Sequence, residues 1–444
     1  MDDYRRLADQ VAADIEGGRL RPGDRLPTQR AFARRHRVAN STAIRVYGEL
    51  VRRGLAVGEV GRGTFVRAAP PLPGPALAEA TGGAPVNLEL NYPVADGQSE
   101  LMARALGALT RADVLGAATR PAAAAGTPEA REAAAAVLAR HGWTPDPERV
   151  LFAGNGRQAI AAAVSSLVPP GGRLGVEALT YPLVKAVAAQ LGVRLVPIAL
   201  DGQGLRPDAL AAAHRASPLS AVYVQPTLHN PLSLTAGEER REELAALLRQ
   251  SELPCVEDTT WSFLAPGAPA PLAARAPGQV VLVDSLSKRL APGLSVGYLV
   301  APTGHLDQLA LALRSGAWTA GGFNLAAATR WAGDGTVDRV VAAKRADAAA
   351  RQEVLRRHLG RFELRTDPAA YYCWWRLPAP WRAETFVGAA ADRGIAVTPG
   401  KAFAVGTPAA QRVPDSVRIG LASPPPAVLA DALERLSALA ATGP

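Results

Sequence analysis

The chain has 444 residues, of which 48% are apolar and 20% are charged, and its formal net charge is +9. These values are typical of a soluble globular protein with two or three domains. No apolar run of eighteen residues and no basic, hydrophobic leader follows Met1, so we expect no membrane span and no export, and a cytoplasmic protein. Two isolated cysteines and six scattered histidines exclude a disulfide framework and a zinc site.

Positive charge is concentrated in residues 1–67. This stretch contains fourteen arginines and eight aspartates or glutamates, which gives +6 of the total +9 in less than a sixth of the chain. Such a concentration is typical of a nucleic-acid-binding module. A solvated basic face is the alternative, and charge alone leaves both open.

Two helices are predicted at the start of this basic stretch. "YRRLADQVAADIEGG" has an apolar stripe of Leu7, Val11 and Ile15 at helical spacing and ends in glycine, so it predicts a first helix. In "PTQRAFARRH", we expect Thr28 to cap a short second helix with Phe32 pointing inward.

A third helix and a β-hairpin follow. We expect Asn40 or Ser41 to cap the helix, and Ile44, Tyr47 and Val51 to face the core. "LAVGEV" and "TFVR" predict two strands joined by the turn "GRG". Three helices and a hairpin make a winged helix-turn-helix, whose third helix enters the major groove. The residues expected to face DNA are Asn40, Ser41, Thr42 and Arg45 on the helix and Arg62 at the wing tip.

The phrases "RLRPGDRLPTQRAFA", "STAIRVYGELVRRGL" and "GRGTFV" resemble the GntR family of winged-helix regulators over residues 4–67. The resemblance implies DNA contacts at Arg30, Ser41, Thr42, Arg45, Arg62 and Gly63. Family members often carry arginine where this chain has Asn40, so the operator sequence does not follow from the resemblance. The alternative is a winged helix that binds protein or is vestigial.

The rest of the chain divides into a linker and an α/β domain. Residues 68–86 are rich in proline, alanine and glycine without an apolar pattern, which indicates a linker. From residue 87 to residue 444, short apolar runs alternate with helical stretches, as expected of a mainly parallel sheet covered on both faces. The predicted strands are "RVLFAG", "GRLGVEAL", "RLVPIAL", "SAVYVQP", "CVEDT", "QVVLVDSL" and "VGYLVAP".

One lysine stands out at the end of a predicted strand. Lys288 follows "VVLVDSLS" and is one of four lysines in a chain that otherwise uses arginine. Arginine stays protonated, whereas a lysine amine can act as a nucleophile and form a Schiff base. We expect Lys185, Lys344 and Lys401 to be ordinary surface lysines, from their helical and loop contexts.

Other strand ends supply groups suited to pyridoxal 5′-phosphate (PLP), because ligands of such folds bind at the carboxyl ends of the strands. Asp258 suits a protonated pyridine nitrogen, Asn230 a phenolate oxygen and Tyr181 ring stacking. In "GNGRQAI", the amides of Gly156 and Arg157 suit a phosphate at a helix N-terminus. Each of these residues alone also fits a turn or cap, so the interpretation depends on their order along the chain.

That order resembles the aminotransferase fold-type I family of PLP enzymes over residues 87–444. With the basic module, the whole chain resembles the MocR-type regulators, in which a winged helix is fused to an aminotransferase-like domain. The resemblance implies that Lys288 forms the internal aldimine and that the chain is a homodimer. It implies pyridine, phenolate and stacking roles for Asp258, Asn230 and Tyr181, and phosphate binding by Gly156, Arg157, Ser285 and Ser287. Arg418 matches the arginine that binds a substrate carboxylate; a surface salt bridge on an edge strand is the alternative.

Two positions depart from the family pattern. Thr260 stands where a tyrosine usually donates to the phenolate, and Ser295 where an arginine usually pairs with the phosphate. We expect Arg157 or Arg289 to replace that cation. These departures make efficient transamination less expected than PLP binding.

Three functions remain open from the sequence. The favoured one is a DNA-binding transcriptional regulator that senses an amino acid or amine through an aldimine with PLP. The others are a working aminotransferase, and a regulator whose degenerate cofactor domain serves for dimerisation. The intact winged helix disfavours the enzyme, and retention of Lys288, Asp258, Asn230 and Arg418 disfavours the scaffold.

Overall fold

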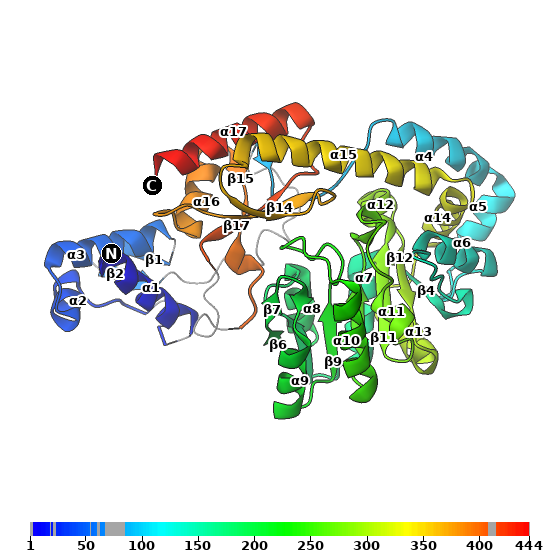
Figure 1. Ribbon diagram of the computed structural model, residues 1–444, viewed down its shortest axis with the longest axis horizontal. Helices are drawn as coiled ribbons and strands as arrows, with labels where there is room; N and C mark the ends of the chain where they lie inside the picture. Colours follow the sequence, from blue (N-terminus) through cyan, green and yellow to red (C-terminus); the bar gives the residue numbers. More distant parts are fainter. Residues whose placement is uncertain are drawn as a thin grey trace.

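The computed structural model describes residues 3–17, 19–20, 24–53, 55–59, 63–66, 85–406 and 414–443. Within these ranges the chain forms an N-terminal helical module, a large α/β unit and a smaller unit of sheet and helices (Figure 1). Arg62 and residues 68–84 of the expected linker lie outside the described residues. In the described part of the chain, no helix is long and apolar enough to cross a membrane.

The N-terminal module is a winged helix-turn-helix, as predicted. Its elements are α1 (Asp3–Glu16), α2 (Gln29–His36), α3 (Asn40–Arg52), β1 (Ala56–Glu59) and β2 (Gly63–Val66). Thr28 caps α2 because its Oγ1 accepts a hydrogen bond from the Ala31 amide at 3.2 Å. The predicted inward residues of α1 and α2 share one core: Leu7, Val11, Ile15 and Phe32.

Two predictions for α3 are wrong. Its N-cap is Ala39, which makes no side-chain cap bond, so neither Asn40 nor Ser41 caps the helix. Tyr47 is buried as expected, but Ile44 and Val51 are 49% and 48% exposed.

The buried stripe of α3 is instead Ala43, Val46, Tyr47 and Leu50. Both stripes have helical spacing, so periodicity did not distinguish them. Ala43 and Ala8 of α1 are fully buried, and their small side chains let α1 and α3 pack closely. The exposed face of α3 therefore carries Ile44 beside Arg45.

The large unit is built on a seven-stranded sheet in the order β4-β12-β11-β10-β9-β5-β6. All seven predicted strands are present: β4 (Val150–Ala153), β5 (Arg173–Glu177), β6 (Arg194–Ile198), β9 (Ala221–Val224), β10 (Cys255–Asp258), β11 (Val280–Ser285) and β12 (Gly297–Val300). β12 runs antiparallel to both neighbours, and the other pairs are parallel. The sheet is thus mainly parallel, as the sequence predicts.

Helices cover both faces of this sheet (Figure 1). One face packs against α7 (Gly156–Leu167), α8 (Pro182–Gln190) and α13 (Leu306–Ser315). The other packs against α6 (Pro128–Leu138), α9 (Pro207–Ala216), α10 (Glu238–Gln250), α11 (Leu272–Arg275) and α14 (Gly322–Gly333). Alternate residues of β11 enter the two cores, with Val281 in one and Leu282 in the other.

The small unit holds a four-stranded sheet, in the order β13-β14-β17-β16. Its elements are β13 (Glu363–Thr366), β14 (Tyr372–Arg376), α16 (Ala383–Ala391), β16 (Thr398–Pro399), β17 (Ser416–Gly420) and α17 (Pro426–Thr442). The long helix α15 (Thr336–Leu359) runs from the large unit to the small one (Figure 1).

Chain segments far apart in sequence meet in the core of the small unit. β3 (Val86–Asn87) pairs with β15 (Ile395–Ala396), and the Gly420 amide of β17 donates to the Leu88 carbonyl at 2.7 Å. The segment after β3 is thereby held against β17. Further elements are α4 (Gln98–Leu106), α5 (Ala112–Ala118), α12 (Leu286–Arg289), β7 (Leu200–Asp201) and β8 (Gly204–Leu205).

Candidate functional site

A cavity of about 290 Å³ lies at the carboxyl ends of the large sheet, where β17 of the small unit approaches it. All nine residues that the sequence suggested for PLP and an effector line it: Gly156, Arg157, Tyr181, Asn230, Asp258, Ser285, Ser287, Lys288 and Arg418. The structure thus brings together residues from six segments that span more than 260 residues of sequence.

Lys288 lies in α12, directly after β11, and is half-buried. Its Nζ donates to the Asn91 carbonyl at 2.6 Å and lies 4.4 Å from the centre of the Tyr92 ring. Burial above all, together with the charges of Arg157, Arg418 and Lys344, lowers the pKa of Lys288 to about 7. A substantial fraction of this amine is therefore neutral and nucleophilic near pH 7.

Lys344 is not the surface lysine that the sequence suggested. It is fully buried on α15, and its Nζ donates to the carbonyls of Lys288 at 2.9 Å and Leu290 at 2.5 Å. Lys344 thus fixes the end of α12. Lys185 is half-buried and donates to two carbonyls near residue 403, whereas Lys401 is exposed and pairs with Glu384, as expected for a surface lysine.

Asp258 ends β10 and is buried at the floor of the cavity. Its Oδ2 accepts hydrogen bonds from Tyr223 Oη at 2.6 Å and Gln225 Nε2 at 3.1 Å, and its Oδ1 accepts one from the Thr260 amide at 2.9 Å. Burial raises the pKa of Asp258. A cation beside this carboxylate would offset that cost and keep it ionised.

Gly156 begins α7, which Asn155 caps through the Gln158 amide at 3.0 Å. A Cβ at position 156 would lie 2.9 Å from Ser285 Oγ, so a side chain there would close the space between the two loops. Ser285 in turn caps α12 by accepting from the Ser287 amide. Small side chains and the first-turn amides of α7, which have no acceptor within the helix, therefore form one wall of the cavity, which suits an oxyanion.

The cation missing at Ser295 is not supplied by Arg289. Ser295 is buried, and its hydroxyl lies 2.6 Å from that of Ser287. Arg289 is buried elsewhere, with its Nη2 2.8 Å from Asp284 Oδ2. Of the two arginines proposed as substitutes, Arg157 is the one that lines the cavity.

Two further groups suit a planar ring in the cavity. Asn230 is buried, and its amide oxygen has no hydrogen-bond partner among the described residues. Amide oxygen and nitrogen positions are interchangeable assignments, so this side chain has bonding capacity left for a ligand. Tyr181 precedes α8, and its charge interaction with Arg157 raises the pKa of that arginine.

Arg418 lies in the middle of the small sheet, not on an edge strand, because β17 is flanked by β14 and β16. It is 5% exposed, and its Nη2 donates to the Glu89 carbonyl at 2.5 Å. Its Nε is buried without a partner among the described residues. A surface salt bridge is therefore excluded for Arg418, and a buried guanidinium faces the cavity with donors to spare.

The residues of the cavity lining that the sequence interpretation missed include Glu89, Asn91, Tyr92 and Trp261. The first three lie in "ELNYP" after β3, which reaches the site through the β3–β15 pairing. Trp261 lies 5.3 Å from Lys288 Nζ, measured to its ring centre. Its position directly after "EDTT" was the available signal, since an aromatic residue near a strand-end carboxylate suits a ring ligand.

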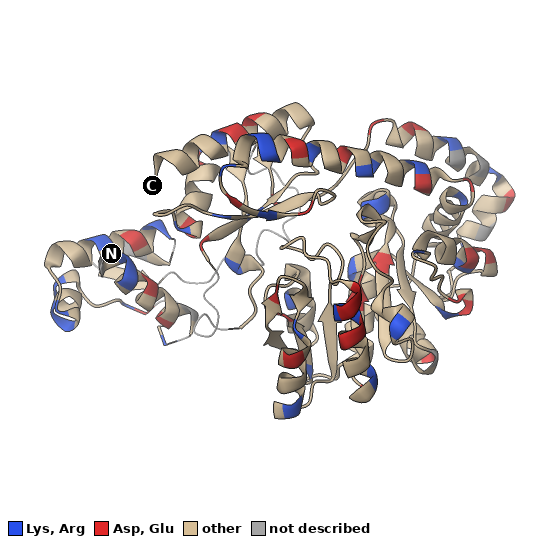
Figure 2. Ribbon diagram, viewed as in Figure 1, with Lys and Arg blue, Asp and Glu red and all other residues tan. Residues whose placement is uncertain are grey.

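The candidate DNA-facing residues lie on α2, α3 and β2. Arg30, Asn40, Ser41 and Arg45 are exposed, Thr42 is half-exposed, and Gly63 has a positive φ of 117° that favours glycine. Figure 2 shows basic residues, coloured blue on the ribbon, along α2 at the outer end of the module. Ile44 is exposed on α3 between Ser41 and Arg45, a position that the sequence interpretation assigned to the core.

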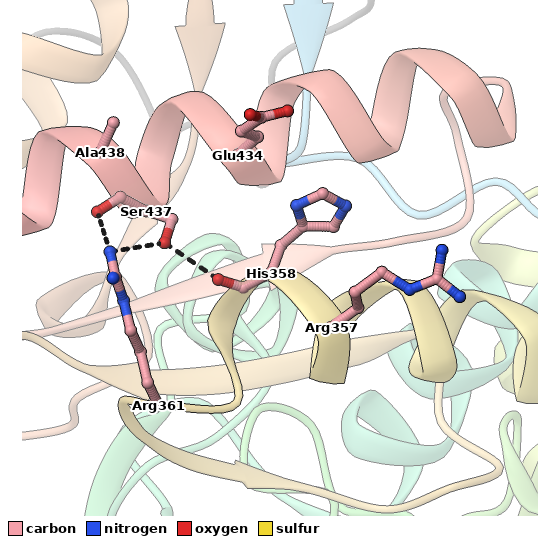
Figure 3. A pocket seen from close by; sticks show the side chains of 6 residues that line it. All are labelled: Arg357, His358, Arg361, Glu434, Ser437 and Ala438. Atoms are coloured by element: carbon pink, nitrogen blue, oxygen red, sulfur yellow. Dashed lines mark hydrogen bonds between the residues drawn. The ribbon is translucent and has the colours of Figure 1, made fainter.

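A second hollow lies between the end of α15 and α17, lined by Arg357, His358, Arg361, Glu434, Ser437 and Ala438 (Figure 3). Arg361 donates to the Ser437 hydroxyl at 3.0 Å, and Ser437 donates to the His358 carbonyl at 2.9 Å (Figure 3). These hydrogen bonds connect α17 to the end of α15. The hollow contains none of the strand-end residues, and its Arg361 and Ser437 side chains connect the two helices.

Comparison with known families matches both parts of the chain. "Bacterial regulatory proteins, gntR family" matches residues 3–66, and "Aminotransferase class I and II" matches residues 85–436. The uncharacterized HTH-type transcriptional regulator YdeF of Bacillus subtilis is 29% identical over 423 residues, 95% of this chain and 90% of that protein. The HTH-type regulator TauR of Rhodobacter capsulatus is 30% identical over 329 residues, 67% of each chain.

Solved structures match the large and small units together. An archaeal alanine:glyoxylate aminotransferase superposes with a TM-score of 0.72 at 22% identity, over 80% of this chain and 91% of that one. The α-aminoadipate aminotransferase LysN of Thermus thermophilus, complexed with N-(5′-phosphopyridoxyl)-L-leucine, superposes with a TM-score of 0.71 at 21% identity. The match covers 81% of this chain and 92% of that one. These similarities establish the fold.

A fold-type I aminotransferase unit joined to a winged helix-turn-helix therefore defines the class of this protein. The chain belongs to the aminotransferase class I and II family, which uses PLP. With its gntR-family region and its relatives among HTH-type regulators, it is a PLP-binding transcriptional regulator of MocR type.

Proposed function

We propose that this regulator senses an amino acid or amine in its PLP cavity and changes its affinity for an operator accordingly. The observation that carries the proposal is the convergence of Lys288, Asp258 and Arg418 on one cavity. PLP supplies an aldehyde that condenses with primary amines, and an electron-withdrawing ring. The three side chains offer an amine, a carboxylate and a carboxylate-binding guanidinium around that space.

Each residue has a role set by its chemistry. Lys288 is the covalent anchor of the cofactor, and Asp258 faces the pyridine nitrogen. Asn230 faces the phenolate oxygen, and Tyr181 stacks on the ring. Phosphate is bound by the set Gly156, Arg157, Ser285 and Ser287, and an effector carboxylate by Arg418. The unpaired donors of Arg418 and the unpaired Asn230 oxygen support these assignments.

DNA reading is assigned to the exposed face of α3 and to the wing. Asn40, Ser41, Thr42 and Arg45 lie at the end of α3 that a winged helix inserts in the major groove. Arg30 and Gly63 flank this end, and Arg62 is assigned to the wing. An operator with two half-sites calls for two such modules, so we propose a homodimer that acts in the cytoplasm.

Sensing is favoured over transamination by two positions in the cavity. Thr260 is too short to replace a tyrosine at the phenolate oxygen, and its backbone amide is bonded to Asp258. Ser295 is bonded to Ser287 and carries no charge. The first change removes a group that tunes the cofactor ring and the second a group that pairs with its phosphate, whereas Lys288, Asp258 and Asn230 are retained.

The test is an absorbance titration of the purified full-length protein with PLP and then with amino acids and amines. We expect a visible band on PLP addition, and a shift of that band with a subset of primary amines. Borohydride reduction followed by peptide mass spectrometry is expected to place the label on Lys288. A label on another lysine contradicts the anchor, and a spectrum indifferent to every amine contradicts sensing.

A further inference from the structure

The cavity contains one acidic side chain without a partner. Among the described residues that line it, Asp258 and Glu89 are acidic. Asp258 accepts three hydrogen bonds from Tyr223, Gln225 and Thr260. The Glu89 carboxylate makes no hydrogen bond or ion pair with any described residue, although the side chain is half-buried.

Glu89 is held in place through its backbone. Asn87 Oδ1 accepts hydrogen bonds from the amides of Glu89 at 2.9 Å and Leu90 at 3.0 Å, which forms a local turn after β3. The Glu89 carbonyl accepts from Arg418 Nη2 at 2.5 Å. The carboxylate is therefore anchored beside the guanidinium assigned to an effector carboxylate.

Burial makes an ionised Glu89 carboxylate costly. Burial raises the pKa of Glu89 to about 7, even though the nearby charge of Arg418 lowers it. A carboxylate in a partly desolvated cavity is costly unless a cation or several donors accompany it. In the described part of the chain, the cation that acts on Glu89 is Arg418, which the proposed function assigns to the effector carboxylate.

The charges that line the cavity can be matched one by one. Three side chains are cationic: Arg157, Lys288 and Arg418. According to the proposed function, Arg157 faces the phosphate and Arg418 binds the effector carboxylate. Lys288 is bonded to the cofactor and is not available to pair with Glu89. Asp258 faces the pyridine nitrogen. Glu89 is the charge that remains, and it is negative.

We propose that the effector is an amino acid whose side chain carries a second cation, and that Glu89 accepts a hydrogen bond from that group. This inference rests on the proposed function, because it presupposes that Arg418 binds the carboxylate. A charge-assisted hydrogen bond from an ammonium group to Glu89 distinguishes such an effector from a neutral amino acid of the same length. Glu89 thereby acts as a specificity-determining residue.

The test compares matched pairs of amino acids on the PLP-loaded full-length chain. L-lysine is paired with L-norleucine and L-ornithine with L-norvaline, so that each pair differs mainly in the terminal ammonium group. Affinity is measured from the shift of the cofactor absorbance and, independently, from the rise in melting temperature. We expect at least one cationic member to bind at least about tenfold more tightly than its neutral partner, the order expected of a hydrogen bond to a charged group.

The variant Glu89→Gln keeps the shape of the side chain and removes its charge. It is expected to reduce the cationic-to-neutral affinity ratio to about one. The matched control is Glu363→Gln, an exposed acid on β13 away from the cavity, which is expected to keep the ratio of the parent protein.

Four outcomes overturn the inference. If neutral partners bind as tightly as the cationic ones, or if Glu89→Gln keeps the preference, Glu89 does not select the effector, and the proposed sensing function stands. If Glu89→Gln tightens the binding of all amino acids equally, Glu89 instead weakens the attraction between Arg418 and effector carboxylates. If no amino acid of either kind changes the spectrum or the melting temperature, the proposed function itself falls.

Discussion

Asp9 of α1 accepts a hydrogen bond from Arg382, with 2.9 Å between Asp9 Oδ2 and Arg382 Nη2. The other oxygen of Asp9 accepts from Arg53 at 2.8 Å, and Arg382 also donates to Asp415 at 2.8 Å. Asp415 directly precedes β17, the strand that carries Arg418. A chain of ion pairs therefore joins the winged helix to the unit that holds the proposed effector arginine.

The variant Arg382→Ala tests whether these ion pairs couple effector binding to operator binding. We expect the free energy of unfolding to change by less than about 1 kcal/mol, because the pair is partly exposed. The ratio of operator affinities with and without effector is expected to move toward one, since linkage requires a contact that differs between the two states. Fluorescence anisotropy with labelled operator measures that ratio. An unchanged ratio rules the connection out, and Arg376→Ala, an exposed pair with Glu363, is the control.

The lowered pKa of Lys288 predicts how PLP capture depends on pH. An amine whose pKa falls from 10.5 to about 7 is mostly neutral above pH 7, so its nucleophilic form is available there. We expect the rate at which the apo-protein captures PLP to rise between about pH 6 and pH 8 and then to level off. Stopped-flow absorbance measures this rate. A rate that keeps rising toward pH 10, as for a free lysine amine, contradicts the lowered pKa.

Arg157 is expected to replace the arginine missing at Ser295. Removing it in Arg157→Ala should weaken PLP affinity by roughly 1.5 to 3 kcal/mol, the typical contribution of a hydrogen bond to a charged group. Equilibrium titration of the apo-protein with PLP measures the loss. Arg206→Ala, on an exposed ion pair away from the cavity, should bind PLP as the parent does. Equal affinity of the Arg157→Ala protein and the parent refutes the substitution.

The exposed face of α3 predicts two kinds of DNA contact. Arg45→Ala should weaken operator binding by about 1 to 3 kcal/mol if its contact is to a base edge. Ile44, 49% exposed beside it, suits contact with a thymine methyl group. The operator is first selected from random duplexes. Replacing the contacted thymine with uracil should then weaken DNA binding by the parent protein but not by the Ile44→Ala variant. Val51→Ala, exposed near the other end of α3, is the control; identical thymine dependence in the parent and Ile44→Ala speaks against the Ile44 contact.

The sequence was sufficient for the large sheet and for most of the cavity. The seven strands are near-continuous apolar runs. The carboxyl ends of parallel strands meet at one edge of a sheet, so Asp258 and Lys288, which follow two such strands, were placed together from the sequence alone. Thr28 was assigned correctly because capping is a local interaction.

The predictions that were wrong or missing concern residues whose surroundings depend on contacts between distant parts of the chain. Glu89 enters the cavity because β3 pairs with β15, more than 300 residues away, and no local pattern indicates that pairing. Lys344 resembles an exposed helix residue, yet α15 packs on α12 and buries it. Ile44 and Ala43 occupy equivalent stripes on α3, and only the close packing of α1 determines which stripe is buried.

The central claim is that an amino acid changes operator affinity through PLP held by Lys288. Its most direct test is the operator affinity of the parent and of Lys288→Ala, each measured by anisotropy with and without the amino acid that shifts the parent's absorbance most. We predict a several-fold change for the parent, the range of about 1 to 3 kcal/mol expected of allosteric coupling, and no change for Lys288→Ala, which should still bind operator. A Lys288→Ala protein that responds fully to the amino acid would contradict the account.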